Sequence, residues 1–290
     1  MVAGIKLSFG IKTVQQRTTY ADMLRVWQEA ENVPSIEHAW LFDHFMPLRG
    51  DFADPCLEGW TLLAAFAAVT QRLRLGLTVT SNTFRHPAVL ANMAATVDIV
   101  SGGRLDFGIG AGIHEVEHQS YGIPLYAPGE RIRRLGEACE IIRRMWTEPA
   151  PNFVGTYYQL KNAYCEPKPV QKPYPPFVIG GLGEKLLLRI IAQYATTWNF
   201  TGGGVESFQQ KSAVLDGHCA AIGRDPHTIV RSTQVRVDLA NLEETRSRIC
   251  EYAQAGITHL ILSLHAPYPK GIAHRLDEEI IQPVKAEFEG

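Results

Sequence analysis

One two-part unit recurs eight times along the chain: a short apolar run rich in β-forming residues, a turn, and a segment with helical periodicity. The apolar runs occupy residues 5–10, 37–42, 73–79, 104–110, 176–181, 197–200, 229–237 and 259–264. Eight such units in 290 residues predict an α/β fold, a (β/α)8 TIM barrel. A doubly wound parallel sheet is the alternative.

The chain contains no stretch that looks like a linker, so we expect a single domain over residues 1–290. The region of about 148–176 departs from the repeat, because it is rich in proline and aromatic residues and has no helical period. This pattern predicts an insertion after the fourth helix that carries a small hairpin.

Charge and cysteine content limit the class of partner. The formal net charge is -2, and Lys and Arg occur only singly or in scattered pairs, so neither nucleic acid nor an anionic membrane is an expected partner. The five cysteines never form a C-x-x-C pair, which suggests neither disulfides nor a thiolate metal site. The N-terminal apolar run is too short for a secretory signal. We therefore expect a cytoplasmic protein that acts on a small molecule.

In a barrel of this kind the chemistry lies where strands end and helices begin. The second apolar run ends in Asp43 and His44. This pair is either a turn aspartate with a packed histidine, or two residues of an active site. The fourth run ends in alternating glycines, Gly108, Gly110 and Gly112, whose spacing does not meet G-x-G-x-x-G. Such glycines indicate either close approach of a ligand or tight packing.

The stretch from His114 to His118 reads H-E-V-E-H and formally matches the H-E-x-x-H zinc motif. A zinc peptidase would need this motif inside a long helix, with a third ligand downstream. Here it follows a glycine-rich strand end and is cut short by Y-G-I-P. We therefore expect no metal, and a zinc peptidase remains only as an alternative.

The fifth run ends in a glycine-rich turn, residues 178–185, that leads directly into a helix. Consecutive N–H groups at the start of a helix can hold a phosphate, although the glycines could equally be needed only for the shape of the turn. The sixth run ends in N-F-T-G-G-G and could add the Thr201 hydroxyl and further N–H groups.

Together, L-F-D-H-F at 41–45, the segment 57–112, E-V-E-H-Q-S-Y-G-I-P at 115–124, 164–185 and Y-A-T-T-W-N at 194–199 resemble the luciferase-like monooxygenase superfamily. Within it the chain is most similar to the actinobacterial oxidoreductases that depend on the deazaflavin coenzyme F420. The resemblance runs from about Phe42 to about Arg224. It implies a TIM barrel that binds a deazaflavin at the carboxyl ends of its strands, and a homodimer as one option.

The resemblance also assigns roles to residues. It implies a non-prolyl cis peptide at Thr78–Val79 that presses on the back of the deazaflavin ring, with catalytic His44 and Asp43 beside it. The implied cofactor-binding residues are Asp43, Thr78, Val79, Ser81, Asn82, Ala111, Gly112, Gly180, Gly181, Gly183 and Thr201. The expected walls of the substrate pocket are Phe45, Trp60, Ile113 and Tyr121. Relatives that oxidise sugar phosphates have a catalytic Glu where this chain has Ile113, which makes that substrate an unexpected one.

The implied activity is transfer of a hydride between coenzyme F420 and a small organic substrate, apolar or carbonyl-containing. His44 is the candidate for the accompanying proton, because imidazole titrates near neutral pH, and Asp43 is expected to orient it. The Glu117–His118 pair is expected to anchor its loop. An FMN-dependent monooxygenase of the same fold and a non-catalytic deazaflavin-binding protein are the alternatives.

Overall fold

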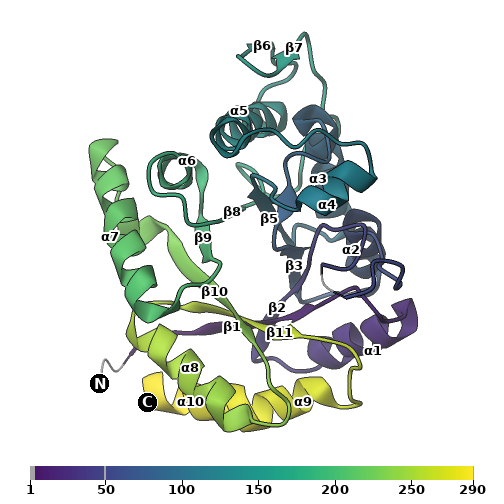
Figure 1. Cartoon of the computed structure of the whole chain (residues 1–290), viewed down its shortest axis with the longest axis vertical. Helices are drawn as coiled ribbons and strands as arrows, with labels where there is room; N and C mark the ends of the chain where they lie inside the picture. The colour runs from purple at the N-terminus through teal and green to yellow at the C-terminus, as the bar shows by residue number, and fades with distance from the viewer. Residues whose placement is uncertain (1–3, 49, 290) are drawn as a thin grey trace.

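The computed structural model describes residues 4–48 and 50–289, which form a closed parallel barrel surrounded by helices (Figure 1). The barrel strands follow the order β3, β2, β1, β11, β10, β9, β8, β5, and pairing of β3 with β5 closes the ring. Their bounds are β1 Ser8–Thr13, β2 Ile36–Leu41, β3 Arg74–Leu77 with its continuation β4 Thr80–Ser81, β5 Leu105–Gly110, β8 Phe177–Gly180, β9 Thr197–Phe200, β10 Val230–Arg236 and β11 His259–Leu264. The predicted TIM barrel is confirmed, and the doubly wound alternative is wrong.

The helices follow the strands as the periodicity predicts. They are α1 Tyr20–Glu31, α2 Gly59–Val69, α3 Pro87–Val100, α4 Glu115–Ser120, α5 Pro128–Thr147, α6 Leu187–Tyr194, α7 Gly204–Ala221, α8 Leu242–Gln254, α9 Ile272–Leu276 and α10 Gln282–Phe288. A π-helical turn, Asp277–Ile281, separates the last two. Pro283 follows that turn and has no N–H to continue an α-helical ladder.

Side chains alternate between the two faces of each barrel strand. On β1, Phe9 and Ile11 are buried in the main core. The interior of the barrel holds a small apolar cluster of Trp40, Val178 and Ile261. It also holds a chain of hydrogen-bonded polar side chains, which joins Lys12, Gln234, Asn199, Ser232 and His259. The inward face is therefore polar over β1, β9, β10 and β11.

The segment after α5 carries the expected hairpin, formed by β6 Phe153–Val154 and β7 Gln159–Leu160. The hairpin extends beyond the ring of helices at the side of α5 and α3 (Figure 1). Just before β7, Tyr158 turns back toward the barrel, where its hydroxyl accepts a hydrogen bond from Asn82 Nδ2 at 3.2 Å. The insertion thus contacts the loop that follows β4.

Over the described residues, no helix combines the length and the apolar character needed to cross a membrane.

Candidate functional site

A cavity of about 330 Å³ opens at the carboxyl ends of the strands from β2 to β9. Its lining consists of Asp43, His44, Thr78, Val79, Thr80, Ser81, Phe84, Gly110, Ala111, Gly112, Ile113, His114, Gly180, Gly181 and Thr201. Eleven of these are residues that the sequence singled out, and they come from five separate turns of the chain. The structure therefore brings most of the predicted site together around one cavity.

Three of the four residues expected to wall the substrate pocket lie elsewhere. Trp60 is only 3% exposed and belongs to the main core, beside Phe107, because it starts the apolar face with which α2 covers the barrel. Phe45 packs on Phe84 and on Tyr121, with ring centroids 4.7 and 5.1 Å apart, so it supports the cavity wall from behind. Ile113 does line the cavity, but it is 81% exposed at the rim.

Two predicted cofactor-binding residues also lie outside the cavity lining. Asn82 is buried just beyond Ser81, and its amide group points to the Tyr158 hydroxyl of the insertion. Gly183 lies exposed in the turn before α6. The resemblance implied both positions because it identifies the loops that follow the strands, but it cannot tell which side of a loop faces inward.

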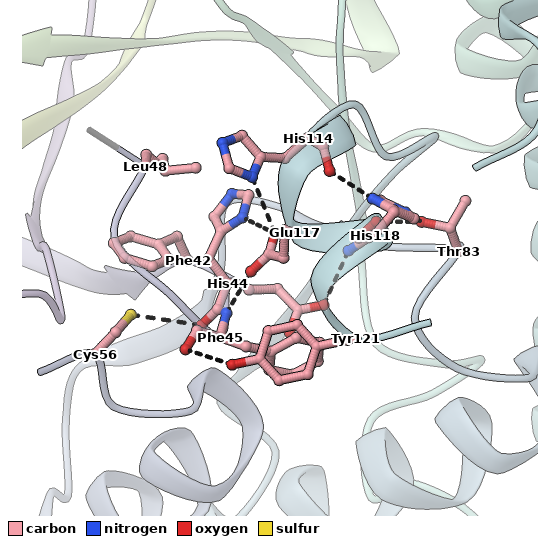
Figure 2. Close-up of polar contacts among 12 residues, drawn as sticks. Phe42, His44, Phe45, Leu48, Cys56, Thr83, His114, Glu117, His118 and Tyr121 are labelled. Carbon is pink, nitrogen blue, oxygen red and sulfur yellow. Dashed lines mark hydrogen bonds and ion pairs between the residues drawn. The ribbon is translucent and has the colours of Figure 1, made fainter. Parts of the chain in front are cut away.

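His44 is held by a buried carboxylate of α4, the short helix that follows β5 (Figure 2). Its Nδ1 lies 2.7 Å from Oε2 of Glu117, which is fully buried, and the other carboxylate oxygen accepts the backbone N–H of Phe45 at 2.5 Å. Burial alone would raise the pKa of Glu117, but the hydrogen bonds from His44 and Phe45 and the charges of the nearby imidazoles hold it below its ordinary value. With Nδ1 directed at the carboxylate, Nε2 is the ring nitrogen left to react.

The expectation that Asp43 orients His44 is wrong, because Asp43 has other partners. Its Oδ2 accepts hydrogen bonds from Arg85 Nη1 at 2.7 Å and from the Ser81 backbone N–H at 3.0 Å. Arg85 also binds Glu58, the residue that caps α2. Burial raises the pKa of Asp43, and the Arg85 charge partly offsets this.

Several buried oxygen atoms at this end of the cavity have no protein partner. They are Asp43 Oδ1 and Thr80 Oγ1, with Asn82 Oδ1 close behind them. A buried acceptor without a partner costs free energy unless a ligand or a water satisfies it. These atoms therefore indicate a ligand that presents hydrogen-bond donors here.

The floor of the cavity is formed where β3 breaks from β4. The Thr78–Val79 peptide is cis, as the resemblance implied. A Cβ on Gly110 would come within 2.7 Å of the Val79 side chain, and one on Gly108 within 1.8 Å of the Leu77 carbonyl oxygen. The alternating glycines are thus required for packing against this floor, and Gly110 and Gly112 also line the cavity.

The opposite end of the cavity is a surface rich in glycines whose φ angles are positive. Gly181 has φ +131°, and Gly202, Gly203 and Gly204 have φ between +75° and +127°. The 18-residue helix α7 begins here, and its N-cap, Gly203, provides no side-chain cap. The free N–H groups and dipole of such a helix end favour an anion, and Thr201 faces the cavity beside them.

The H-E-x-x-H residues do not form the arrangement of a zinc peptidase. His114 precedes α4, and both ring nitrogens of His118 are engaged: Nδ1 donates to the His114 carbonyl and Nε2 contacts the Thr83 hydroxyl, each at 2.7 Å (Figure 2). No cluster of three metal-ligating side chains occurs within residues 4–48 and 50–289. Glu117 and His118 instead connect the loop after β5 to those after β2 and β4.

Purified protein is accordingly expected to contain well under one zinc per chain, because His118 has no free lone pair in this arrangement. Elemental analysis after dialysis against a metal-free buffer measures this directly. One tightly held zinc per chain, together with loss of activity on chelation, would restore the metallopeptidase alternative.

Four residues that shape the cavity were not expected there: Thr80, Phe84, Arg85 and His114, the last of which was considered only as part of the H-E-x-x-H match. All four adjoin segments that had been singled out. Arg85 could have been suspected, since it is the one cation in the polar stretch between β3 and α3 and buried carboxylates need a partner. The link from Glu117 to His44 spans 73 residues, and no local pattern reports it.

The chain is similar in sequence to proteins of a known family. A family model described as luciferase-like monooxygenase matches residues 1–282. The chain is 31% identical over 253 residues to an F420-dependent glucose-6-phosphate dehydrogenase of Microbacterium testaceum, covering 83% of this chain and 73% of that protein. It is 27% identical to an FMNH(2)-dependent dimethylsulfone monooxygenase of Pseudomonas putida, covering 83% and 65%.

Among solved structures, an F420-dependent secondary alcohol dehydrogenase in complex with an F420-acetone adduct superimposes with a TM-score of 0.84. The alignment covers 96% of this chain and 99% of that one, at 18% identity. It supports the fold.

Proposed function

Because the chain belongs to the luciferase-like monooxygenase family, we propose that it is an oxidoreductase that transfers a hydride between coenzyme F420 and a small alcohol or carbonyl compound. The observation that carries the proposal is the single cavity that joins His44 and Asp43 at one end to the glycine-rich anion surface at the other. A cofactor with a heterocyclic ring and a phosphate needs both ends.

The residues present fit a deazaflavin. The pyrimidine edge of such a ring carries N–H and C=O groups, and Asp43 Oδ1 and Thr80 Oγ1 lie buried there without partners. Val79 and the glycines beside it would contact the flat ring, and Thr201 with the start of α7 would hold the phosphate. When bound, the deazaflavin supplies the carbon that accepts or donates the hydride.

The protein's own contribution is to position the substrate and to move a proton. Glu117 fixes the His44 ring so that Nε2 faces the cavity, where it can take the proton of a substrate hydroxyl as the hydride leaves, or return it to a carbonyl in reverse. The other proton stays on Nδ1 throughout, where it is hydrogen-bonded to Glu117. His44 acts as the base or acid, and Glu117 as its positioning residue.

FMN would meet the same ring and phosphate surfaces, so the alternative of an FMN-dependent monooxygenase rests on the similarity to the dimethylsulfone monooxygenase. The higher identity to the F420-dependent dehydrogenase favours the deazaflavin. Sugar phosphate oxidation is disfavoured, because the exposed Ile113 stands where dehydrogenases that act on sugar phosphates have a catalytic Glu.

Cofactor titration tests the proposal. Fluorescence titration of the protein with F420 and with FMN is expected to show tighter binding of F420. Bound F420 should then be reduced by an alcohol, or its reduced form reoxidised by a carbonyl compound, in single-turnover mixing. Preferential FMN binding would favour the monooxygenase. Tight F420 binding with no redox change across a broad panel would favour a non-catalytic carrier.

Replacing Asp43 with asparagine is expected to weaken cofactor binding by roughly tenfold or more, the usual size of a hydrogen bond to a charged group. The single acceptor oxygen of asparagine is needed by the Ser81 N–H and Arg85, so its NH2 group would face the N–H of the ring. Titration of the variant with F420 measures the loss.

Asp216→Asn is the matched control, because Asp216 binds Arg231 on the outside of the barrel. It should leave F420 affinity unchanged. If the folded Asp43→Asn protein bound F420 with wild-type affinity, Asp43 would not be a cofactor-binding residue.

A further inference from the structure

Lys12 projects from β1 into the mouth of the barrel, where no carboxylate meets it. Its ammonium group donates to Gln234 Oε1 at 2.7 Å and to the carbonyl of Thr78, a residue of the cavity floor, at 3.2 Å. It lies 5.9 Å from the centre of the Phe42 ring. Burial lowers the pKa of Lys12 to about 8. A cation in this position, held by neutral groups alone, is costly unless an anion joins it.

Two more basic side chains, Arg236 and His265, lie at the ends of the neighbouring strands β10 and β11. Ser263 of β11 pairs with Lys12 on one side and with Arg236 of β10 on the other. Gln234 points into the barrel, since it binds Lys12, so Arg236, two residues further, leaves the same face of the strand. His265 follows β11, and its pKa is lowered by partial burial and by the charges of Arg236 and Lys12.

Two carboxylates, Asp238 and Glu244, line one surface cavity together with Arg236, but neither forms an ion pair with it. Asp238 accepts the backbone N–H of Ala240 at 2.9 Å, and Glu244 forms an ion pair with Arg248 at 2.9 Å. Between residues 4 and 289, Arg49 aside, none of Lys12, Arg236 and His265 takes part in an ion pair.

The other half of the mouth is different. There Arg85 is neutralised by Asp43 and Glu58, and His44 is paired with Glu117. The β10–β11–β1 side therefore carries positive charge that the protein itself does not balance. In the ring, β1 is the neighbour of β2, which carries Asp43 and His44, and β11 and β10 follow β1 on its other side (Figure 1).

We propose that Lys12 and Arg236, with His265 beside them, form a subsite for an oxyanion carried by the substrate, so that the enzyme acts on alcohols or carbonyl compounds that bear a carboxylate or a phosphate. This inference rests on the proposed function and deepens it. It replaces the expectation of an apolar substrate, because of the four residues that supported it, Phe45, Trp60, Ile113 and Tyr121, only the rim residue Ile113 lines the cavity. The substrate then spans the mouth, with its reacting oxygen at His44 and its oxyanion at Lys12.

The test measures binding to the F420-loaded protein by calorimetry, with matched probes. 4-Oxopentanoate carries a carboxylate, and 5-methyl-2-hexanone is its neutral counterpart of similar shape. Glucose 6-phosphate serves only as a binding probe for the phosphate group, since its oxidation is disfavoured by Ile113. The variants are Lys12→Met and Arg236→Gln, and Arg189→Gln on the outer side of α6 is a control with the same change in net charge. Lys12→Met leaves the Thr78 carbonyl and Gln234 Oε1 without their hydrogen-bond donor and can therefore destabilise the fold. Arg236→Gln changes an exposed side chain and is expected to leave folding intact.

Wild-type protein is expected to bind an anionic probe more tightly than the neutral ketone. Each of the two variants is expected to bind that anionic probe roughly 10- to 100-fold more weakly. Affinity for F420 and for the neutral ketone should stay within a few fold. The probe that is preferred, carboxylate or phosphate, identifies the oxyanion.

Two results would overturn the inference: equal binding of charged and neutral probes, or an equal loss of F420 affinity in the variants, which would assign these cations to the cofactor. Failure of the proposed function looks different, because the wild-type protein would then not bind F420 at the loading step.

Discussion

Replacing His44 with alanine is expected to lower the rate of hydride transfer by roughly 10²- to 10⁴-fold, the usual contribution of a positioned acid or base. F420 affinity should stay within a few fold, because the proposed phosphate site lies at the far end of the cavity, at Gly181 and Thr201. Truncation also leaves the buried Glu117 carboxylate without its imidazole partner, so some loss of stability is expected as well. Single-turnover rate, F420 affinity and thermal midpoint on one preparation separate these effects.

Two further variants make the result interpretable. His44→Asn keeps an N–H that can donate to Glu117 but removes the nitrogen that accepts a proton, so it should recover stability without recovering rate. His86→Asn replaces a histidine that caps α3 outside the cavity with another good N-cap, and should leave the rate unchanged. A folded His44→Asn protein with wild-type turnover would sink the proposed role of His44.

The fold was predictable because apolar strand-like runs and segments with helical hydrophobic periodicity are both pronounced and alternate regularly along the chain. Strand runs such as 259–264 coincide with the observed β11, and Pro87 starts α3 as its missing N–H suggests. The ends of elements were less predictable. The apolar run at Ile5 begins three residues before β1, because packing against the last helix, to which Gly4 and Ile5 hydrogen-bond at Phe288, extends the apolar stretch beyond the sheet.

The site was predictable where it depends on strand ends, and unpredictable where it depends on contacts between loops. Asp43 and Gly181 follow strands and line the cavity as expected. Trp60 was misplaced because the sequence does not show whether an aromatic side chain at the start of a helix, here α2, faces the cavity or the core beneath the helix. Glu117 was taken for part of a loop anchor, and only the folded chain shows that it reaches His44.

Gly181 shows why one substitution cannot separate a structural glycine from a binding one. Its φ of +131° disfavours any side chain, and an added Cβ would come within 2.4 Å of Leu187. A bulky residue there would therefore disturb the start of α6 as well as the anion surface. Thr201, whose hydroxyl can be removed by an isosteric valine, is the better probe of that end of the cavity.

Replacing Glu117 with glutamine is expected to slow hydride transfer by roughly 10²- to 10⁴-fold through the wrong His44 tautomer, as when a carboxylate that orients a catalytic histidine becomes an amide. Glu117 accepts two hydrogen bonds, from His44 Nδ1 and from the Phe45 N–H, but glutamine has only one acceptor oxygen. If its NH2 group faces His44, Nδ1 must become the acceptor. The proton then sits on Nε2, which can no longer take one from the substrate. F420 affinity should be unchanged, and Glu115→Gln on the exposed side of α4 is the matched control.

The pH dependence of stability distinguishes this role from simple packing. Burial would raise the pKa of Glu117, but its hydrogen bonds and the nearby imidazoles hold the pKa below the ordinary 4.5 in the folded state. The carboxylate therefore stabilises the fold above pH 4.5, and this contribution is lost as the pH falls through the lower folded value. At neutral pH the variant should be less stable by about 1–3 kcal/mol, the cost of an unmatched buried polar group. Denaturant unfolding at a series of pH values should show this gap closing in acid. A gap that is constant down to strongly acidic pH would mean that the Glu117 charge adds nothing, and that His44 is held by shape alone.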